Sequence, residues 1–435
     1  MAKDIPALII ADKNKKIYEV PFLEATGMKG GRFFRLDPGK LIKLHPDSEL
    51  FFLPSRIPVG FDPETGEYIK VEKSPFKKST QPCYAVAAFL SPGYTATYSA
   101  SYREKGEPSI LPLFSYAAVT FYKGEFYATG IRVDREKRQE LAGMDQRLIN
   151  ENIGKFRRSF PKNRLIRHLE RCALTYCCPA AKNFFLQRYE GPLPTSPKCN
   201  ARCIGCISHQ PGGRCPVTQP RIRFIPTPEE ISQTALVHLN AVRDPVVSFG
   251  QGCEGEPLMA GETLVKAVDL IRRKTKKGII NLNTNASRPD IIKKLFDAGL
   301  DSIRVSLNSV QEDHYNAYYK PCGYSFRDVM RSIKEAKKAG GFVSINYLIM
   351  PGFTDSKGEF NALKRFLSRT NVDMIQWRNL NYDPIAYFKD LKIDIKPESM
   401  IGVENVIKGV HEEFPRLMKG YFNPSLGRMR RRERS

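Results

Sequence analysis

The second half of the chain alternates short apolar runs with longer amphipathic segments, and this alternation restricts the fold more than any other feature. Five runs have the length and composition of buried strands: Val246–Phe249, Ile279–Asn283, Ser302–Leu307, Phe342–Ile349 and Asp373–Trp377. Each interval between them is long enough to hold a helix. Alternating strands and helices indicate parallel strands joined by right-handed crossovers. We therefore predict an α/β fold in which residues 191–420 form a partial (β/α)6 barrel.

Helix boundary signals support this alternation. Ser287 is expected to cap a helix that stops at Gly299, and Thr227 is expected to cap another that begins at Pro228. A third helix is predicted to end at Gly340–Gly341, because glycine readily takes the conformation that terminates a helix. In β/α barrels the chemistry lies in the loops after the carboxyl ends of the strands, so those loops are the place to look for a site.

Residues 1–134 have a different pattern, in which short alternating runs are separated by glycine and proline. This pattern predicts a mostly-β N-terminal domain. Within it, Thr95–Tyr102 has the alternation of one strand, with alanine and tyrosine on one face. Ala117–Val133 is predicted to form a hairpin that turns at Lys123–Gly124.

The chain is strongly basic, with 69 lysines and arginines against 46 acidic residues and a formal net charge of +23. Residues 135–190 are predicted to form a basic helical connector, and residues 421–435 form an arginine-rich tail. A positive field attracts polyanions, so RNA is one candidate substrate, a protein is another, and a small metabolite is a third. There is no signal-peptide layout, and no apolar run approaches the roughly 20 residues that span a bilayer. We expect a cytoplasmic protein without a membrane partner.

Three of the ten cysteines, Cys199, Cys203 and Cys206, lie on one short segment. Cytoplasmic thiols stay reduced, so clustered cysteines are first considered as metal ligands. Three thiolates leave one iron of a [4Fe–4S] cluster without a protein ligand. The alternative is zinc, because His209 or Cys215 would complete a tetrahedral set. That alternative corresponds to a zinc-stabilised, non-catalytic RNA-binding protein.

The cysteine segment and the barrel together resemble the radical S-adenosylmethionine (radical SAM) superfamily, whose signature is CxxxCxxC after the first strand of a TIM-like barrel. The resemblance covers roughly Leu193 to Leu380. It implies that Cys199, Cys203 and Cys206 bind a [4Fe–4S] cluster, whose open iron binds S-adenosylmethionine. It also implies reductive cleavage of that cofactor to a 5′-deoxyadenosyl radical for C–H activation, and an electron donor such as flavodoxin or ferredoxin. The resemblance leaves the substrate open.

Further family motifs follow the later strands. The segment Gly250–Pro257 resembles the Gly-Gly-Glu-Pro turn, in which glycines allow close backbone approach and a glutamate offers a counter-charge to the ammonium group of the cofactor. Polar residues at the other strand ends resemble the family's contacts to the ribose, the methionine part and the carboxylate. The resemblance implies these cofactor-binding residues: Gly255, Glu256, Asn283, Asn285, Ser306, Asn308 and Arg378.

Three positions depart from the family pattern. Gly205 stands where an aromatic residue usually precedes the third cysteine, so another side chain must cover that face. Glu254 stands where the family often has glycine, and it is a second candidate acid. No cysteine follows Cys322 in this sequence, so we do not expect the cysteine-rich C-terminal extension of many peptide-modifying members.

Four other cysteines raise the hypothesis of an auxiliary iron–sulfur cluster. Cys172, Cys177 and Cys178 lie close together before the barrel, and Cys215 follows the first cysteine segment. Neighbouring side chains in an extended stretch point to opposite faces, so one site rarely uses both Cys177 and Cys178. Buried thiols in a helical connector are the alternative.

Overall fold

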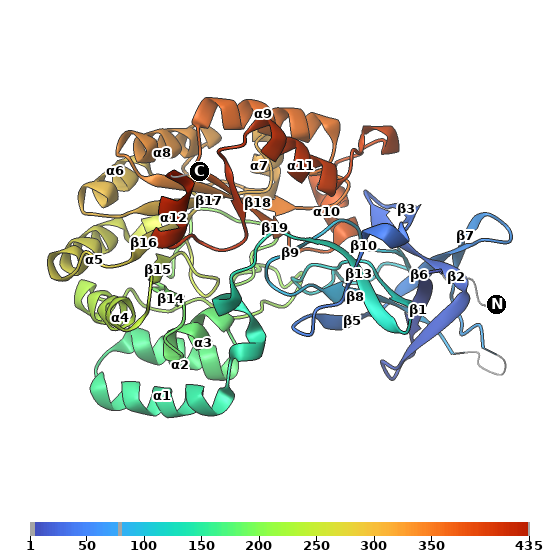
Figure 1. The fold of residues 1–435 in the computed structure, drawn as a ribbon, viewed down its shortest axis with the longest axis horizontal. Helices are drawn as coiled ribbons and strands as arrows, with labels where there is room; N and C mark the ends of the chain where they lie inside the picture. The colour runs from blue at the N-terminus through green and yellow to red at the C-terminus, as the bar shows by residue number, and fades with distance from the viewer. Residues whose placement is uncertain (1–4, 77–80, 434–435) are drawn as a thin grey trace.

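The computed structural model describes residues 5–76 and 81–433, which form two sheets and a set of helices that surround one of these sheets. Figure 1 shows the parallel sheet with its flanking helices at one end and the N-terminal strands at the other. The three connector helices lie along the side of the parallel sheet. The described helices include none with both the length and the apolar character needed to cross a bilayer.

The parallel sheet has seven strands whose order in space is their order in the chain. These strands are β14 (Glu190–Pro192), β15 (Val246–Phe249), β16 (Ile279–Thr284), β17 (Ser302–Leu307), β18 (Phe342–Ile349), β19 (Met374–Asn379) and β20 (Met418–Gly420). Every neighbouring pair is parallel. The five predicted strands and the predicted partial barrel are confirmed. The sheet has one strand more than the predicted six, because β20 adds to the edge of β19.

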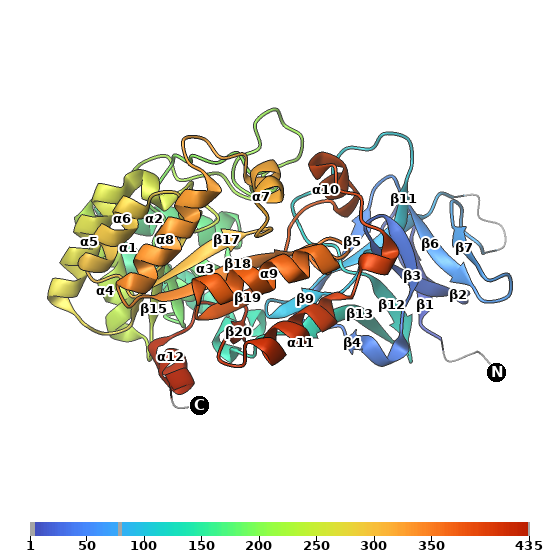
Figure 2. The same cartoon turned by 90° about the horizontal axis from the view of Figure 1, so that it is seen from above.

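Helices follow these strands, and most of them cover the outer face of the sheet (Figure 1). They are α4 (Pro228–Ala241), α5 (Gly261–Lys274), α6 (Pro289–Asp297), α7 (Glu312–Tyr319), α8 (Phe326–Lys338), α9 (Lys357–Thr370), α10 (Pro384–Leu391), α11 (Val403–Glu413) and α12 (Leu426–Glu433). In the view of Figure 2, α7 and α10 lie at one end of the barrel and α12 lies at the other. The helices α7 and α10 follow the carboxyl ends of β17 and β19, so they mark the end where barrel chemistry is expected.

The predicted helix boundaries are correct at three positions, one of them Gly299, which follows the C-cap of α6, and wrong at one. Thr227 caps α4 in a capping box with Glu230, and α8 ends at Lys338, just before the predicted glycines. Ser287 does not cap α6, whose N-cap is Arg288. The Ser287 hydroxyl instead accepts a hydrogen bond of 3.0 Å from Asn200, so it is used in a tertiary contact to the cysteine segment.

The two faces of the parallel sheet differ in polarity. Alternate residues pack with the helices in one apolar core: Val247, Phe249, Ile280, Leu282, Ile303, Val305, Val343, Ile345, Ile375 and Trp377. Because successive side chains of a strand point to opposite faces, the residues between them face the inside of the barrel. Those residues are mostly polar: Ser248, Asn281, Asn283, Arg304, Ser306, Ser344, Asn346, Gln376 and Arg378. The barrel therefore encloses a polar interior, which suits a polar ligand.

The N-terminal strands pair antiparallel in a second sheet. They are β1 (Ala7–Ala11), β2 (Ile17–Lys29), β3 (Arg32–Arg35), β4 (Leu41–Lys43), β5 (Glu49–Leu53), β6 (Arg56–Asp62), β7 (Glu67–Lys70), β8 (Tyr84–Phe89), β9 (Tyr94–Ala96), β10 (Ser99–Ala100), β11 (Tyr102–Glu104), β12 (Val119–Tyr122) and β13 (Glu125–Arg132). The predicted hairpin is β12 and β13, and its turn has Lys123 at φ 50° and Gly124 at φ 79°. The single strand predicted over Thr95–Tyr102 is wrong. The segment is divided into β9, β10 and β11, which pair with three different strands.

The N-terminal sheet docks on the carboxyl end of β19. The Thr95 hydroxyl donates to the backbone oxygen of Trp377 at 2.6 Å, and Asn379 exchanges hydrogen bonds with the backbone of β9. The carboxylate of Asp383, which is fully buried, accepts hydrogen bonds from Arg56 at 2.7 Å and from Tyr102 at 3.0 Å. These contacts hold the N-terminal sheet against the end of the barrel where the predicted site lies.

The connector forms three helices: α1 (Gln146–Ser159), α2 (Arg164–Thr175) and α3 (Pro179–Phe185). Their apolar faces make a small core of their own, which includes Phe156, Leu169 and Phe185. The helical pattern predicted for this region is present, although Leu174 on α2 points to solvent with 42% of its surface exposed. Charged residues occupy the outer faces, so the connector is basic on its surface.

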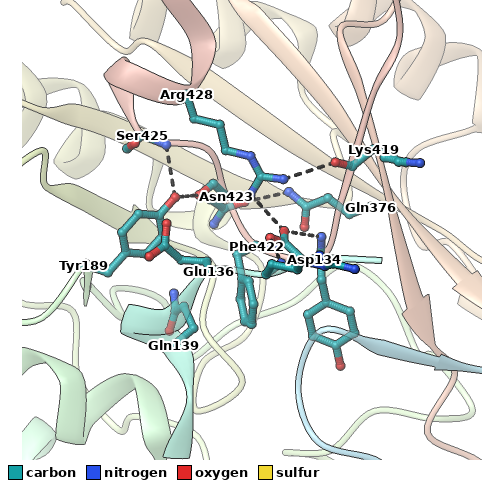
Figure 3. Close-up of polar contacts among 12 residues, drawn as sticks. Asp134, Glu136, Gln139, Tyr189, Gln376, Lys419, Phe422, Asn423, Ser425 and Arg428 are labelled. Carbon is teal, nitrogen blue, oxygen red and sulfur yellow. Dashed lines mark hydrogen bonds and ion pairs between the residues drawn. The ribbon is translucent and has the colours of Figure 1, made fainter. Parts of the chain in front are cut away.

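The C-terminal segment fills the seam between the first and last strands of the partial barrel (Figure 3). Asn423 is 1% exposed, and its side-chain amide donates to Glu190 at 2.7 Å and to Asn283 at 3.1 Å. Its side-chain oxygen accepts a hydrogen bond from Gln376 at 3.1 Å. The carboxylate of Asp134 accepts hydrogen bonds from the backbone of Tyr421 and from Arg428. The residues from 426 to 433, predicted as part of an arginine-rich tail, form the helix α12.

We expect Asn423→Ala to lower the free energy of unfolding by about 1–3 kcal/mol, because it leaves buried polar groups without their partner. Chemical denaturation measures this change. The matched control is Asn405→Ala, which removes an asparagine of α11 whose side chain donates one exposed hydrogen bond, to the oxygen of Ile401. Equal stability of the two variants would contradict a structural role for Asn423 in closing the barrel.

Candidate active site

The loop that carries Cys199, Cys203 and Cys206 is held along the end of α7. The backbone N–H of Arg202 donates to the oxygen of Tyr319 at 2.9 Å, and that of Ile204 donates to the oxygen of Tyr318 at 3.0 Å. The three cysteines are partly buried. The loop therefore has a defined backbone, with its thiols at the carboxyl end of the parallel sheet.

Glu254 joins the cysteine loop to the glycine-rich loop that follows β15. Its carboxylate is 4% exposed and accepts four backbone hydrogen bonds. The donors are Thr195 at 2.7 Å and Ser196 at 3.0 Å, which precede the cysteines, and Gly250 and Gln251, both at 2.7 Å. Burial raises the pKa of Glu254 to about 7, although these hydrogen bonds act to lower it. Its acceptor positions are occupied by the backbone, which makes Glu254 a positioning residue and leaves it poorly suited to the role of acid.

The two residues after Glu254 also bind the backbone that leads into the cysteine loop. Gly255 donates to the oxygen of Ser196 at 2.6 Å, and Glu256 donates to the oxygen of Lys198 at 2.9 Å. A Cβ atom on Gly255 would lie 2.1 Å from the Lys198 oxygen, so only glycine permits this approach. The two predicted cofactor-binding residues thus sit directly beside the residue that precedes Cys199.

The Glu256 carboxylate is buried and tied to the end of β16. It accepts hydrogen bonds from the backbone N–H of Asn285 at 2.8 Å and from that of Leu258 at 3.2 Å, and it also accepts one from the Thr284 hydroxyl. Burial raises the pKa of Glu256 to about 7, while the hydrogen bonds act to lower it. No lysine or arginine among the described residues forms an ion pair with Glu256, so its buried carboxyl is a suitable counter-charge for an ammonium group.

Asn283 and Asn285 lie on the same side of the barrel as Glu256. Asn283 donates to the oxygen of Gly250 at 3.2 Å from inside the barrel. Asn285 donates to the side chain of Asn200 at 2.9 Å, and therefore contacts the cysteine loop. The structure brings these two predicted residues together with the two loops that carry Glu256 and Cys199.

The other predicted cofactor-binding residues are more widely spread. Ser306 faces the barrel interior from β17. Asn308 is fully buried, and its amide donates to the oxygen of His314 and to the Tyr387 hydroxyl, both at 3.3 Å, while its side-chain oxygen has no hydrogen-bond partner among the described residues. The guanidinium group of Arg378 lies 4.5 Å from the centre of the Tyr421 ring.

The spacing of the three thiols suits a cluster better than a single ion. Four ligands around one zinc ion lie about 3.8 Å apart when the zinc–sulfur distance is about 2.3 Å. Within the described residues, the set of three ligand atoms that lie within 4.8 Å of one another does not include Cys199, Cys203 and Cys206. Thiolates that each bind a different iron of a cube are more widely spaced. Of the alternative zinc ligands, His209 is exposed and Cys215 is buried in the barrel core.

Two residues of the site have no counterpart in the sequence-based prediction. Arg221 donates to the Cys206 sulfur at 3.3 Å and to the Ser208 hydroxyl at 3.1 Å. Burial acts to raise the pKa of Cys206, but the Ser208 backbone and Arg221 outweigh it and lower that pKa. Arg221 lies fifteen residues beyond Cys206, in a segment without a recognisable pattern, so no sequence signal marks it.

Tyr318 on α7 is the second residue that the sequence did not indicate. A Cβ atom on Gly205 would lie 2.6 Å from the Tyr318 hydroxyl oxygen, so this tyrosine occupies the space beside Gly205. The aromatic group expected just before the third cysteine is therefore supplied by a helix more than a hundred residues later in the chain. Glycine at position 205 and tyrosine at position 318 form a complementary pair.

The four cysteines proposed for an auxiliary cluster do not converge. Cys172 and Cys178 belong to the connector core, Cys177 is exposed, and Cys215 lies in the barrel core. A cluster that needs all four is inconsistent with this arrangement. The sequence spacing was misleading here because Cys215 follows the loop back toward the barrel, whereas Cys172 faces the connector.

Comparison with known protein families identifies the domain that this site belongs to. The model of the radical SAM superfamily matches residues 193–363. The chain contains a radical SAM domain. The match includes the cysteine loop, the glycine-rich loop and the strands β15 to β18. The predicted resemblance and the enzyme class are confirmed, and the radical SAM family implies an iron–sulfur cluster and S-adenosylmethionine. The alternative of a non-catalytic zinc protein is not supported.

Curated relatives of the radical SAM domain include GTP 3′,8-cyclases. The enzyme of Listeria monocytogenes is 25% identical over 203 residues, which are 45% of this chain and 54% of the relative. The enzyme of Aquifex aeolicus is 30% identical over 218 residues, which are 50% of this chain and 62% of the relative. The chain thus spans between half and two thirds of the length of these relatives.

Solved structures with similarity to this chain include an enzyme named anSMEcpe with bound AdoMet and methylornithine synthase. The first is 18% identical with a TM-score of 0.38, over 52% of this chain and 59% of that chain. The second is 17% identical with a TM-score of 0.38, over 62% of this chain and 77% of that chain.

The complementarity of Gly205 and Tyr318 is testable with a double-mutant cycle. We expect Gly205→Ala to destabilise the protein by about 1–3 kcal/mol, because the added methyl group overlaps the Tyr318 hydroxyl. Tyr318→Phe removes that hydroxyl, so the double variant should regain most of the loss. Thermal unfolding of the four proteins measures the coupling. Strictly additive effects would show that the two residues do not share this space.

Proposed function

We propose that this radical SAM enzyme binds a [4Fe–4S] cluster through Cys199, Cys203 and Cys206 and uses it to cleave S-adenosylmethionine reductively. The observation that supports this most strongly is the arrangement of three partly buried thiols on an ordered loop, whose sulfur atoms do not all lie within 4.8 Å of one another as the ligands of one ion would. The N–H group of Arg221 donates to the Cys206 sulfur, and such hydrogen bonds tune the potential of an iron–sulfur cluster.

The proposed cofactor site lies between the cysteine loop and the barrel interior. Glu256 offers a carboxylate to the ammonium group, and the close approach of Gly255 holds the loop in place. Asn283, Asn285, Ser306, Asn308 and Arg378 remain the proposed polar contacts to the rest of the molecule. When bound, the cluster and S-adenosylmethionine supply a 5′-deoxyadenosyl radical, which abstracts hydrogen from a substrate C–H bond. An electron donor such as flavodoxin or ferredoxin reduces the cluster.

We expect Cys203→Ala to lose the cluster and all cleavage of S-adenosylmethionine while it retains the fold, because the substitution removes only a sulfur atom from a partly buried residue that packs at the edge of the barrel core. Iron analysis of anaerobically reconstituted protein should fall from about four irons per chain toward zero. The matched control is Cys322→Ala, which removes an exposed thiol close to the same loop and should retain both properties. A full iron content in Cys203→Ala would exclude the proposed cluster site.

A cavity next to the cysteine loop favours a phosphate-bearing substrate. It has a volume of about 340 Å³ and is lined by Arg164, Arg167, Arg171, Arg221 and Arg223 together with His168, Tyr176, Pro220 and Phe224. Within the described residues, only Arg164 of these arginines forms an ion pair, with Glu230 at 2.8 Å. Arg221 belongs both to this cavity and to the contact with Cys206. Arginines bind phosphate groups, and aromatic rings stack on bases.

We infer that the substrate contains nucleotides. The arginine cavity, the net charge and the relatives named GTP 3′,8-cyclases favour this class over a peptide. RNA is the macromolecular form of such a substrate, and GTP is the small form. The N-terminal sheet, which docks on the carboxyl end of β19, is placed to form one wall of a site for a large substrate.

This inference predicts salt-sensitive RNA binding that depends on the cavity. We expect the double variant Arg167→Ala/Arg223→Ala to weaken binding and to reduce the slope of log K against log salt by about 0.7 for each phosphate that the protein no longer neutralises. The matched control is Arg273→Ala/Arg331→Ala, which removes the same charge from exposed sites on α5 and α8. Stimulation of S-adenosylmethionine cleavage by GTP instead of RNA would identify the substrate as a free nucleotide. Stimulation of S-adenosylmethionine cleavage by a peptide library, and by neither RNA nor GTP, would overturn the inference that the substrate contains nucleotides.

A further inference from the structure

A second group of metal-binding side chains lies in the connector, apart from Cys199, Cys203 and Cys206. His168 and Cys172 are four residues apart on α2, so they share one face of the helix. The Nε2 atom of His168 lies 3.5 Å from the Sγ atom of Cys172. Cys172 is 2% exposed, while His168 is partly buried. The pair therefore places an imidazole nitrogen and a thiol sulfur, both common metal ligands, on the same side of α2.

The third member comes from a distant part of the chain. Cys253 belongs to the glycine-rich loop after β15 and is 3% exposed, and its thiol lies close to that of Cys172. The ligand atoms of His168, Cys172 and Cys253 all lie within 4.8 Å of one another. The described residues contain no other group of three histidine, cysteine or acidic side chains that converges in this way.

The dimensions of this group match a single ion. Zinc binds a histidine nitrogen at about 2.1 Å and a thiolate at about 2.3 Å, which places tetrahedral nitrogen and sulfur ligands about 3.6 Å apart. The observed separation of 3.5 Å between His168 and Cys172 agrees with that value. The mixture of imidazole and thiolate is typical of zinc sites. Three converging ligands within this distance are too close for a [4Fe–4S] cube, in which each thiolate binds its own iron.

We propose that His168, Cys172 and Cys253 bind one zinc ion. The ion links the connector helix α2 to the glycine-rich loop, at the residue immediately before Glu254. Cys178 begins α3 and packs against the same core, and its backbone N–H donates to the oxygen of Cys172 at 3.0 Å. It therefore offers a further thiolate near the three ligands. The site offers a structural metal in place of the auxiliary cluster that the sequence raised as a hypothesis, and it does not depend on the proposed catalytic function.

The site has a mechanical consequence for the catalytic region. Cys253 lies between Gly252 and Glu254, and Glu254 holds the backbone that leads into the cysteine loop. An ion that fixes Cys253 to α2 therefore restrains the glycine-rich loop from its outer side. The arginine cavity opens beside His168, so the same ion also fixes α2, which supplies three of its arginines.

Metal analysis of protein prepared without oxygen, in medium that contains zinc, tests the proposal. We expect about one zinc per chain in the parent protein, and less than about one fifth of that in Cys172→Ala, Cys253→Ala and His168→Ala. His168→Cys should retain the ion because it restores a ligand. Cys83→Ala is the matched control, since it removes a buried thiol from the N-terminal sheet and should leave the zinc content unchanged. Circular dichroism of each variant checks that it is folded.

Cobalt substitution gives a readout that does not depend on metal stoichiometry. Co²⁺ bound to two thiolates should add visible absorption bands to Cys203→Ala, which lacks the iron–sulfur cluster, and not to the double variant Cys203→Ala/Cys253→Ala. A parent without zinc overturns the proposal, as does a Cys172–Cys253 disulfide found by mass spectrometry of unreduced protein. About eight irons per chain, with four lost in Cys172→Ala, would identify an auxiliary cluster instead. Loss of iron in Cys203→Ala together with retained zinc separates this site from the catalytic one.

Discussion

The rest of the site depends on the buried carboxylate of Glu254 and the four backbone N–H groups that it binds. Two of these groups precede the cysteine loop and two begin the glycine-rich loop, so one side chain sets the distance between them. A carboxylate with several backbone donors remains stable in a buried place because its oxygens are satisfied. The adjoining Gly255 can approach Lys198 only because this distance is short. The predicted cofactor-binding residues of the glycine-rich loop and the candidate cluster ligands therefore lie on two loops that one side chain joins.

A polar barrel interior and an apolar outer face determine how the remaining parts assemble. The outer side chains pack with the helices, which leaves the inward polar groups in need of partners. Asn423 satisfies several of them from the C-terminal segment, and the seam between β14 and β20 is closed without a further strand. On the opposite side, Asp383 and Asn379 bind the N-terminal sheet to the carboxyl end of β19. The open end of the barrel is thus enclosed by segments that are distant in sequence.

The sequence-based predictions were correct where residues within one strand or one helix turn determine the local structure. Each strand of the barrel is an apolar run of its own, and its register follows from alternation along that run. The Thr227 cap was predictable because both partners lie within one turn of helix. The prediction failed where a tertiary partner competes. The Ser287 hydroxyl binds Asn200 instead of a helix terminus, and the stretch from Thr95 to Tyr102 is divided among three partner strands.

The sequence by itself was sufficient to predict the fold class of the barrel, the radical SAM domain and the three candidate cluster ligands, because these depend on spacing along the chain. The tertiary structure alone decided which distant groups meet. Arg221 reaches Cys206, Tyr318 fills the space at Gly205, and Cys253 joins His168 and Cys172. The physical reason is that such contacts arise when loops are folded against one another. Their partners are separated by from fifteen to more than a hundred residues and share no periodicity.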